Sequence, residues 1–529
     1  MNKISILDCT LRDGGYINNW HFKRNAIQRI VDYLEEAHID IIECGFLQEC
    51  SYNENVALFS DVNQIKPFIT PKRPNTMYVA MLALGDIEPE KIAPYDGESI
   101  DGIRITFHKH EWNACKEVVQ DLCAKGYKVF VQPVGTIAYS DLELIRLVQE
   151  VNTLSPFAFY IVDTLGTMYQ KDLLHLFNLI DNNLSPDIQI GFHSHNNLQL
   201  SFANAQELLR MKTRRNIIID SSVFGMGRGA GNLATELVTQ YINDNLEYRF
   251  QVTPLLSIVD QFLGSIYNKT PWGYSAPYYL AAVGGCHPNY ATYLMNKQTL
   301  NVEEISKILN QIPNEERSLY NENLIERLYL EYQRYQIDDS EAYKRIAKII
   351  EGRNILLVAP GQSIITYKES IQEYIQTNNP LIISVNFVTD LYPQDLVFIS
   401  NKKRSVQLLD SISGYKNMIV TSNLYSQMPK DCLFVNYSNL IGEGREADNA
   451  GAMLISLLYK VGIKSVTLAG FDGFNTHNYE NYYSEDMNSV IDRQALLEKN
   501  EGIRRQLLHL SKKVSIKFLT PSLYDLTCD

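Results

Sequence analysis

The chain has 529 residues, a net charge of −13 and an apolar fraction of 45%. This length exceeds one usual domain, so two or more domains are expected. The acidic balance, without any block of Lys or Arg, argues against nucleic acid as a partner. Eight cysteines form no CxxC pair and no disulfide framework, and no window of about 18 apolar residues occurs. These features predict a cytoplasmic protein with reduced thiols and no membrane span.

The first half of the chain alternates strand and helix patterns with short connections between them. The expected strands are residues 3–11, 39–46, 77–84, 102–108, 128–134, 157–166, 187–196 and 217–227. They are apolar at consecutive positions, which is typical of a parallel sheet buried on both faces. The amphipathic segments among them are 24–36, 111–125, 141–154, 171–183, 201–211 and 232–245. Eight such units in about 250 residues predict a (β/α)8 TIM barrel. An open doubly wound sheet is the alternative.

Polar residues stand where these strands end, which is the end of a barrel that carries the active site. Strand one runs into Arg12 and Asp13 and then into two glycines that permit a sharp turn. Later strand ends carry Glu43, Arg104, Gln132, Thr164, His193 and His195, and strand eight leads into the glycine-rich run 225–232. We therefore expect these side chains to converge.

The remaining chain divides by pattern into two further parts. Residues 1–250 form the expected barrel domain, and residues 251–351 an aromatic and then charged, helical extension that contributes to the barrel mouth. From 352 to 529 the alternation restarts and predicts a smaller, Rossmann-like α/β domain. Its expected strands are 354–359, 381–386, 396–400, 417–422, 432–436, 465–470 and 515–519, and its helices are 368–376, 450–461 and 493–512.

His193 and His195 lie two residues apart on an expected strand, so both point to one face. With Asp13 at the end of strand one, two imidazoles and a carboxylate can hold a divalent metal and leave positions open for a substrate. The alternative is a pair of hydrogen-bonded polar residues near a strand end. Mixed N/O ligation fits Mn²⁺, Mg²⁺, Co²⁺, Fe²⁺ or Zn²⁺ and does not choose among them.

Three motifs carry a family resemblance. Residues 8–15 (DCTLRDGG), 193–197 (HSHNN) and 227–232 (GRGAGN) resemble motifs of the DRE-TIM metallolyase superfamily. That group contains 4-hydroxy-2-oxovalerate aldolase, 3-hydroxy-3-methylglutaryl-CoA lyase, isopropylmalate synthase and homocitrate synthase. The resemblance covers roughly residues 1–300.

The resemblance implies functions for matching positions. The metal ligands would be Asp13, His193, His195 and Asn232, with manganese expected first and magnesium, cobalt or zinc as alternatives. Arg12 matches the arginine that steadies an enolate oxygen, whose charge a guanidinium would neutralise. Thr164 suits the substrate carboxylate, with Arg104 and Gln132 as further substrate-binding candidates.

Some residues depart from the family motifs, and these departures indicate which branch of the superfamily the chain resembles. Condensing synthases carry Glu where this chain has Gly15, which weakens the acyl-CoA interpretation. The aldolase branch places a histidine base where Tyr16 stands, and residues 287–294 resemble the segment that supplies an active-site tyrosine, matching Tyr290. The catalytic candidates are therefore Arg12, Tyr16, His287 and Tyr290, with His21 as a further acid–base candidate. His287 is preferred as the base, because histidine needs little tuning near neutral pH.

The function implied is a metal-dependent aldolase acting on a 2-oxo acid, with pyruvate expected, and an aldehyde, in a homodimer. An acyl-CoA-dependent condensing enzyme and a non-enzymatic binding or scaffold protein are the alternatives. In the C-terminal domain, residues 358–363 close a strand where backbone N–H groups could cradle a phosphate. Residues 451–472 weakly resemble sialyltransferase-like, nucleotide-dependent transferase domains. A nucleotide- or phosphate-linked sugar, and sugar or polysaccharide biosynthesis, are therefore expected there, against a purely structural domain.

Overall fold

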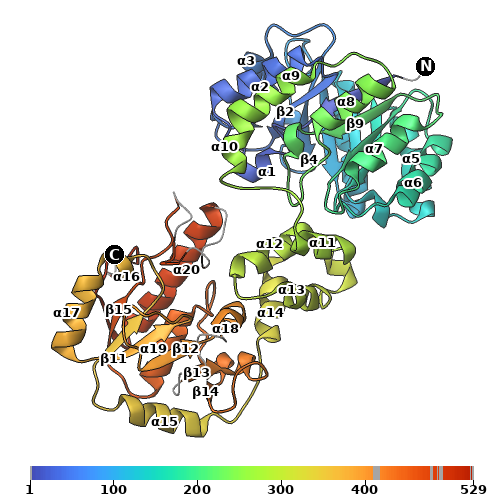
Figure 1. Cartoon of the computed structure of the whole chain (residues 1–529). Helices are drawn as coiled ribbons and strands as arrows, with labels where there is room; N and C mark the ends of the chain where they lie inside the picture. Colours follow the sequence, from blue (N-terminus) through green and yellow to red (C-terminus); the bar gives the residue numbers. More distant parts are fainter. Residues whose placement is uncertain are drawn as a thin grey trace. The chain divides into compact units, whose positions relative to one another are not determined.

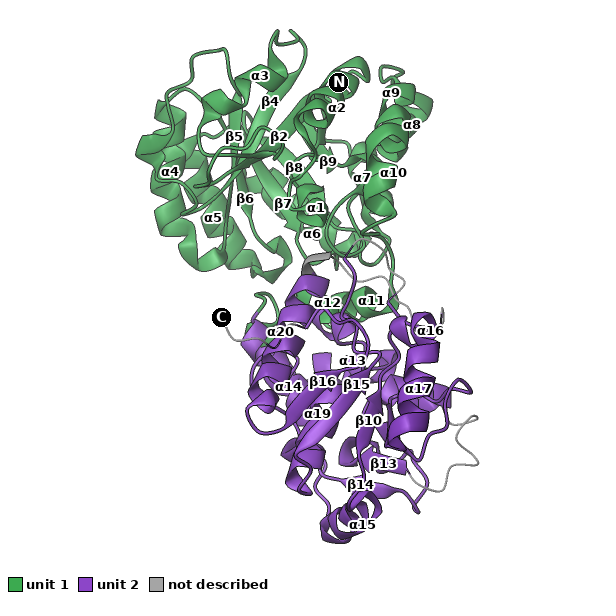
Figure 2. Ribbon diagram, turned by 90° about the vertical axis from the view of Figure 1, so that its left-hand side faces the viewer, with its two compact units in different colours: residues 1–292, 313–320 green, residues 293–312, 321–529 purple. Residues whose placement is uncertain are grey.

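The structure is a computed structural model that describes residues 3–408, 418–476, 481–484, 487, 493–524 and 526. The chain forms two compact units, coloured separately in Figure 2. The barrel unit comprises residues 1–292 and 313–320, and the second unit residues 293–312 and 321–529. Residues 251–351 are thus divided between the two units. That they form a separate extension stays a prediction.

The barrel unit contains eight parallel strands that close into a barrel, as expected (Figure 1). These strands are β1 (Ile4–Asp8), β2 (Ile41–Leu47), β4 (Met77–Ala83), β5 (Gly102–Phe107), β6 (Lys128–Pro133), β7 (Ala158–Asp163), β8 (Gln189–Ser194) and β9 (Ile217–Ser221). Closure is shown by β1, which pairs with β9 on one side and with β2 on the other. A short strand, β3 (Leu58–Phe59), adds to β2.

Helices surround this barrel and cover its outer face (Figure 1). They include α2 (Arg24–Glu36), α4 (Trp112–Ala124), α5 (Asp141–Leu154), α6 (Gln170–Asn183), α7 (Ser201–Arg210), α8 (Thr235–Asn245) and α9 (Val252–Ile258). Their apolar stripes form one continuous core with the outward side chains of the strands. A second, smaller cluster that includes Leu7, Val79, Phe130 and Tyr160 fills part of the barrel interior. The barrel is therefore packed, and chemistry is confined to its mouth.

The first strand is shorter than expected, and this matters for the site. β1 ends at Asp8 rather than at residue 11, and the Asp13 N–H then donates to the Cys9 carbonyl at 2.8 Å. A Cβ at Gly14 would overlap the carbonyl oxygen of Thr10, so only glycine allows this tight turn before α1 (Gly15–Asn18). The turn brings Arg12 and Asp13 into the barrel mouth as buried groups.

The second unit contains a seven-stranded parallel sheet, as expected, with strand order β14-β13-β12-β11-β10-β15-β16. The strands are β10 (Ile355–Val358), β11 (Leu381–Val385), β12 (Leu396–Ile399), β13 (Met418–Thr421), β14 (Leu433–Val435), β15 (Ser465–Ala469) and β16 (Ser515–Phe518). Residue 417, where one strand was expected to begin, lies outside the described residues.

Both faces of this sheet are buried, because alternate strand residues join different cores. Ile355 and Leu357 pack with α15 (Ser340–Ile350), α19 (Ala450–Lys460) and α20 (Arg493–Ser511), whereas Leu356 and Val358 pack with α16 (Ser363–Thr366) and α17 (Lys368–Asn378). The unit therefore has three layers.

Shorter helices occupy the region between the two sheets in the sequence. They include α11 (Ala276–Val283), α12 (Pro288–Lys297), α13 (Val302–Leu309) and α14 (Glu322–Tyr332). The last of these, α14, begins at Glu322, because Asn321 caps it by accepting the N–H of Leu324 at 3.1 Å. No helix in the described part of the chain is long and apolar enough to cross a membrane.

One buried arginine generates a test of the barrel fold. The Arg215 guanidinium donates to the Asp181 carboxylate and to the carbonyls of residues 181, 184, 185 and 188, which ties the end of α6 to β8. Arg215→Met should lower the free energy of unfolding by about 3 kcal/mol, because buried acceptors lose their donor.

Urea unfolding followed by tryptophan fluorescence measures this change, since all three tryptophans (Trp20, Trp112 and Trp272) lie in the barrel unit. Exposed Arg210, changed to Met, is the control and should shift stability by less than about 0.5 kcal/mol. An unchanged urea midpoint in Arg215→Met would contradict the inference that the hydrogen bonds of Arg215 stabilise the barrel.

Candidate metal centre at the barrel mouth

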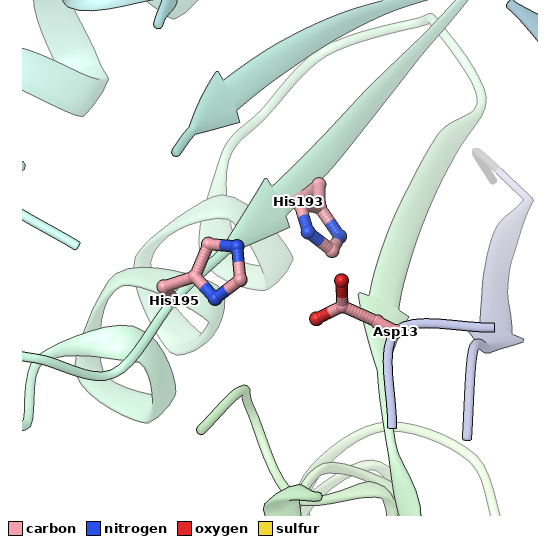
Figure 3. Close-up of side chains that lie close together, drawn as sticks. All are labelled: Asp13, His193 and His195. Atoms are coloured by element: carbon pink, nitrogen blue, oxygen red, sulfur yellow. The ribbon is translucent and has the colours of Figure 1, made fainter. Parts of the chain in front are cut away.

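Three buried side chains meet at the mouth of the barrel. Asp13, His193 and His195 offer ligand atoms that all lie within 4.8 Å of one another. His193 belongs to β8. His195 follows this strand and forms an isolated antiparallel β-bridge with Asn232. Figure 3 shows the Asp13 carboxylate pointing toward the two imidazole rings. The convergence expected from the sequence is therefore present in the structure.

Asp13 is held as an anion. The Arg12 Nη1 lies 2.5 Å from one carboxylate oxygen, and the Asn232 amide donates to the other at 2.5 Å. Burial by itself would raise the pKa of Asp13, but the adjacent Arg12 guanidinium holds it well below its usual value. The carboxylate is thus available as a charged ligand across the neutral range.

Both histidines are suited to act as neutral ligands. The Nδ1 of His193 lies 3.0 Å from an Asp220 carboxylate oxygen, which favours the proton on Nδ1 and leaves the Nε2 lone pair free. Burial lowers the pKa of His195 to about 3, so this ring is neutral near pH 7. Neutral imidazole is the form that binds a metal.

Several buried polar atoms in and beneath this site have no hydrogen-bond partner among the described residues. They include Oδ1 of Asn232 and Nη2 of Arg12, and also Oε1 of Glu43, Nη1 of Arg104 and Oγ of Ser194. Buried polar groups are almost always hydrogen-bonded, so the first two, whose side chains contact Asp13, indicate a missing ligand. A cation beside the Asn232 oxygen and an anion beside the Arg12 nitrogen would satisfy these two. With the carboxylate and the imidazoles, the donor set fits a divalent metal of the Mn²⁺, Mg²⁺, Co²⁺ or Zn²⁺ class.

A charged network lies beneath the three candidate ligands and is centred on Arg104 of β5. The Arg104 Nη1 lies 2.7 Å from a Glu43 carboxylate oxygen, and Nη2 pairs with Asp220, which in turn faces His193. Glu43 also accepts from Arg12 Nε at 2.8 Å. Burial would raise the pKa of Asp220, but Arg104 and His193 lower it. The network therefore links the orientation of His193 to that of Arg12.

The expected substrate-binding residues differ in how deeply they are buried. With its amide oxygen turned toward Arg104, Gln132 accepts from that guanidinium at 2.6 and 2.7 Å, so both residues belong to the buried network. Thr164 follows β7, is half-buried, and accepts the Gly135 N–H at 2.9 Å, which leaves its hydroxyl proton available. Substrate binding by these three residues stays a prediction.

The tyrosine and histidine near the first turn differ in surroundings. The Tyr16 ring stacks under the Arg228 guanidinium at 4.2 Å and meets Trp20 edge-on at 4.6 Å between ring centres. His21 is exposed, with Nδ1 2.9 Å from the Asn19 carbonyl oxygen. Of the two, Tyr16 is coupled to the site through Arg228, whose charge also acts on Asp13.

His287 is held as a neutral ring with a defined tautomer. Its Nδ1 accepts the Asn289 N–H at 3.2 Å, so the proton is on Nε2, which becomes a donor. Burial lowers the pKa of His287 to about 3, and the positive Arg228 adds to the effect. The turn that carries His287 packs on the glycine-rich loop, since a Cβ at Gly229 would lie 3.6 Å from Pro288.

Tyr290 is fully buried and its hydroxyl faces two carbonyls, those of Glu316 at 2.9 Å and Leu319 at 2.7 Å. These contacts attach the segment 313–320 to the start of α12. A catalytic function for Tyr290 stays a prediction.

Sequence reasoning did not assign functions to Asp220 and Arg228. Asp220 closes the run Ile217-Ile218-Ile219, and a carboxylate within an apolar barrel strand is a signal that could have identified it. Arg228 lies in the glycine-rich run 225–232, which the sequence singled out only as a motif after strand eight. Its charge acts on Asp13, His195 and His287 at once.

Comparison with known proteins agrees with this geometry. Residues 103–255 match the HMGL-like family model. The chain is 27% identical over 234 residues to oxaloacetate decarboxylase of Mycobacterium tuberculosis, which covers 44% of this chain and 67% of that protein. It is 26% identical over 250 residues to 4-hydroxy-2-oxovalerate aldolase of Pseudoalteromonas translucida, covering 46% of this chain and 70% of that protein.

Among solved structures, HMG-CoA lyase from Brucella melitensis is 14% identical, with a TM-score of 0.39, and the match covers 49% of this chain and 96% of that one. The barrel unit of this chain is therefore similar to HMGL-like domains, the family that the DRE-TIM metallolyase motifs also resemble.

Proposed function

We propose that the barrel unit is a divalent-metal-dependent aldolase that acts on a 2-oxo acid, with pyruvate as the small product or donor and an aldehyde as its partner. One observation carries the proposal. The unpartnered Arg12 Nη2 is buried beside the cluster of Asp13, His193 and His195. A metal-ligand set next to a free guanidinium donor is suited to an anionic oxygen substrate.

The charges of the site support this substrate class. The ion-paired network of three buried carboxylates (Asp13, Glu43 and Asp220) and two buried guanidiniums (Arg12 and Arg104) has one negative charge in excess. The charge of Arg228 acts on Asp13 and offsets this excess. A divalent cation would therefore leave the site positive, which favours an anionic substrate such as a 2-oxo acid.

Different residues of this chain would contribute to different parts of the reaction. A metal held by Asp13, His193, His195 and Asn232 would polarise the 2-oxo acid as a Lewis acid. Cleavage removes the proton of the C4 hydroxyl, breaks the C3–C4 bond, releases the aldehyde and leaves an enolate, which is protonated at C3. Arg12 Nη2 would stabilise the enolate oxygen, and the Thr164 hydroxyl would bind the carboxylate.

His287 is proposed as the residue that binds the reacting oxygen of the substrate. Its neutral ring offers Nε2–H as a hydrogen-bond donor, which would stabilise the alkoxide that forms when the C4 hydroxyl loses its proton to solvent. Its function as the base itself stays a prediction. The aldehyde, the metal and a place in sugar or polysaccharide biosynthesis are extensions of the proposal, which rest on the sequence resemblance. A homodimer is expected on the same ground.

Metal binding tests the ligand set without any activity assay. Chelator-treated protein, titrated with Mn²⁺ by calorimetry, should bind one ion per chain, and Asp13→Asn or His193→Ala should abolish binding. Asp220→Asn should weaken it by about 10- to 100-fold, because the His193 ring loses the group that orients it. His175→Ala is the control, since that exposed histidine pairs only with Asp141 at 2.8 Å. A wild-type protein that takes up no metal would contradict the proposal.

Proton exchange tests the substrate class. The methyl signal of pyruvate should disappear in deuterium oxide when the metal-loaded protein is added, as followed by proton NMR. Arg12→Ala should slow this exchange by about 10²–10³-fold, because a preorganised donor to the developing oxyanion is lost. Arg24→Ala, which removes an exposed arginine paired with Glu54, should have no effect.

Two outcomes would overturn the assignment. If no small 2-oxo acid exchanges, the substrate class is wrong. If acetyl-CoA and a 2-oxo acid release free thiol without an aldehyde, the barrel is a condensing enzyme instead.

The pH profile tests His287. Burial lowers the pKa of His287 to about 3, so the ring is protonated only in strong acid and is neutral above about pH 5. The exchange rate should therefore be flat from about pH 5 to 8, whereas an ordinary histidine would give an inflection near about pH 6.5. His287→Asn should lower the rate by at least about 10²-fold at every pH. If Tyr16→Phe has this effect and His287→Asn does not, Tyr16 is the acid–base residue.

A further inference from the structure

The sheet of the second unit has a point at which its strand order reverses. From β10 the chain builds outward through β11, β12, β13 and β14, and then returns to place β15 and β16 on the other side of β10. At such a point the loops after two adjacent strands leave in opposite directions and open a crevice. Here the two strands are β10 and β15, paired in parallel from Leu356 to Val358.

A cavity lies at this point, beyond the carboxyl ends of the strands. Its volume is about 170 Å³, it opens to solvent, and all of its lining residues belong to the second unit. The walls include the loops after β10, β11, β12 and β15, the start of α19, part of α20 and residues 297–299. A cavity of this volume admits part of a small organic ligand and not only a single inorganic ion.

Glycines allow the two central loops to touch. Gly470 has φ +74°, and a Cβ there would overlap the Ala359 carbonyl oxygen. The Gly361 N–H donates to the Gly470 carbonyl at 3.1 Å, and a Cβ at Gly361 would lie 2.5 Å from the Asp472 carboxyl carbon. The close contact fixes Asp472 in the floor of the cavity.

Asp472 occupies the position expected for a phosphate. Its carboxylate accepts the Ser363 N–H at 2.7 Å and also the Ser363 hydroxyl, so it fills the N-terminal end of α16. The phosphate cradle expected at residues 358–363 is therefore already taken by a carboxylate, which corrects that expectation. Its remaining lone pairs line the cavity and are suited to accept hydroxyl groups of a ligand.

The positive part of the cavity is at residue 297. The Lys297 ammonium lies 5.2 Å and 5.1 Å from the ring centres of Tyr293 and Tyr329, and no carboxylate of the described residues forms an ion pair with it. The nearby Asp448 is engaged by the hydroxyls of Tyr329 and Tyr437. Burial lowers the pKa of Lys297, but Asp448 and Glu446 raise it above its usual value, so the side chain is charged.

The start of α19 lines the same cavity. Asn449 caps this helix by accepting the Ala452 N–H at 3.1 Å, and within the described residues the N–H groups of Ala450 and Gly451 have no acceptor. Gly451 packs directly on the Phe471 ring, which leaves no room for a Cβ. Free N–H groups at a helix start and a lysine without a carboxylate partner together suit an oxyanion.

The charged side chains of the lining balance in number. Three cations line the cavity, namely Lys297, Arg404 and Lys499. Of the three acids, Asp448 and Asp472 are engaged by hydroxyl groups, and Glu446 is the third. Phe471, Phe474 and Tyr524 add aromatic surface against which a flat ring can pack.

We propose that this cavity binds a nucleoside phosphate, with the phosphate at Lys297 and the first turn of α19, the ribose hydroxyls at Asp472, and the base on the aromatic surface. The site is independent of the barrel chemistry. The nucleotide would be either a ligand in its own right or the carrier of a linked sugar, and the two share these contacts.

Calorimetry on the full-length protein tests the proposal. The probes are CMP, UMP, AMP and GMP, the four parent nucleosides, inorganic phosphate and UDP-glucose. At least one nucleotide should bind at least about tenfold more tightly than its nucleoside and than inorganic phosphate. Tighter binding of UDP-glucose than of UMP would identify a linked sugar as the ligand. If no nucleotide binds at millimolar concentration, the proposal is overturned.

Two variants locate the site by different routes. Lys297→Met keeps most of the length of the side chain, removes its charge and should weaken nucleotide binding by at least about tenfold. Ala450→Pro removes one N–H at the first position of α19, where proline is tolerated, and should weaken the nucleotide but not the nucleoside.

Matched controls keep the test decisive. Lys307→Met removes an exposed lysine paired with Glu303, and Val302→Pro places proline at the first position of α13; both should leave binding unchanged. His193→Ala, in the barrel, should also leave it unchanged, so failure of the metal site and failure of this site are distinguishable. Unaltered nucleotide affinity in both Lys297→Met and Ala450→Pro would overturn the location.

Discussion

Five buried charges share the mouth of the barrel, and the geometry of the site depends on their pairing. Arg104 is fully buried between Glu43 and Asp220, so neither carboxylate is left without a counter-charge. Removing one member of such a group leaves an unpaired buried charge, which is far more costly than the pairing is favourable. Because Asp220 faces His193 and Glu43 faces Arg12, the same pairing that makes the charges tolerable also orients a candidate metal ligand and the candidate oxyanion donor.

The network explains why the candidate ligands have the ionisation that a metal requires. Asp13 stays ionised beside Arg12, and His195 stays neutral because it is buried. The orphaned atoms of Arg12 and Asn232 are then points at which the protein alone is incomplete. Charge and hydrogen bonding thus both support the proposal that a divalent cation and a carboxylate anion complete this site.

The two units place their sites by the same rule of parallel sheets. Side chains that follow the strands meet at the carboxyl ends, at the barrel mouth in one unit and at the reversal between β10 and β15 in the other. The contents differ. The barrel presents carboxylate and imidazole, whereas the second unit presents Lys297, Asp472 and the free start of α19. Their chemistries are therefore separable, and each can be tested in variants of the other.

The sequence by itself determined the eight barrel strands, the seven-stranded sheet and the candidate ligand set, because buried parallel strands are continuous apolar runs and the motifs follow directly at their ends. Tertiary structure alone decided how these residues act. Asp220 and His193 are 27 residues apart, and only barrel closure brings them together. Asp472 and Ser363 are 109 residues apart, and only sheet pairing puts a carboxylate where a phosphate was expected. Local sequence specifies strands and turns, whereas the partners of a buried charge depend on which strands become neighbours.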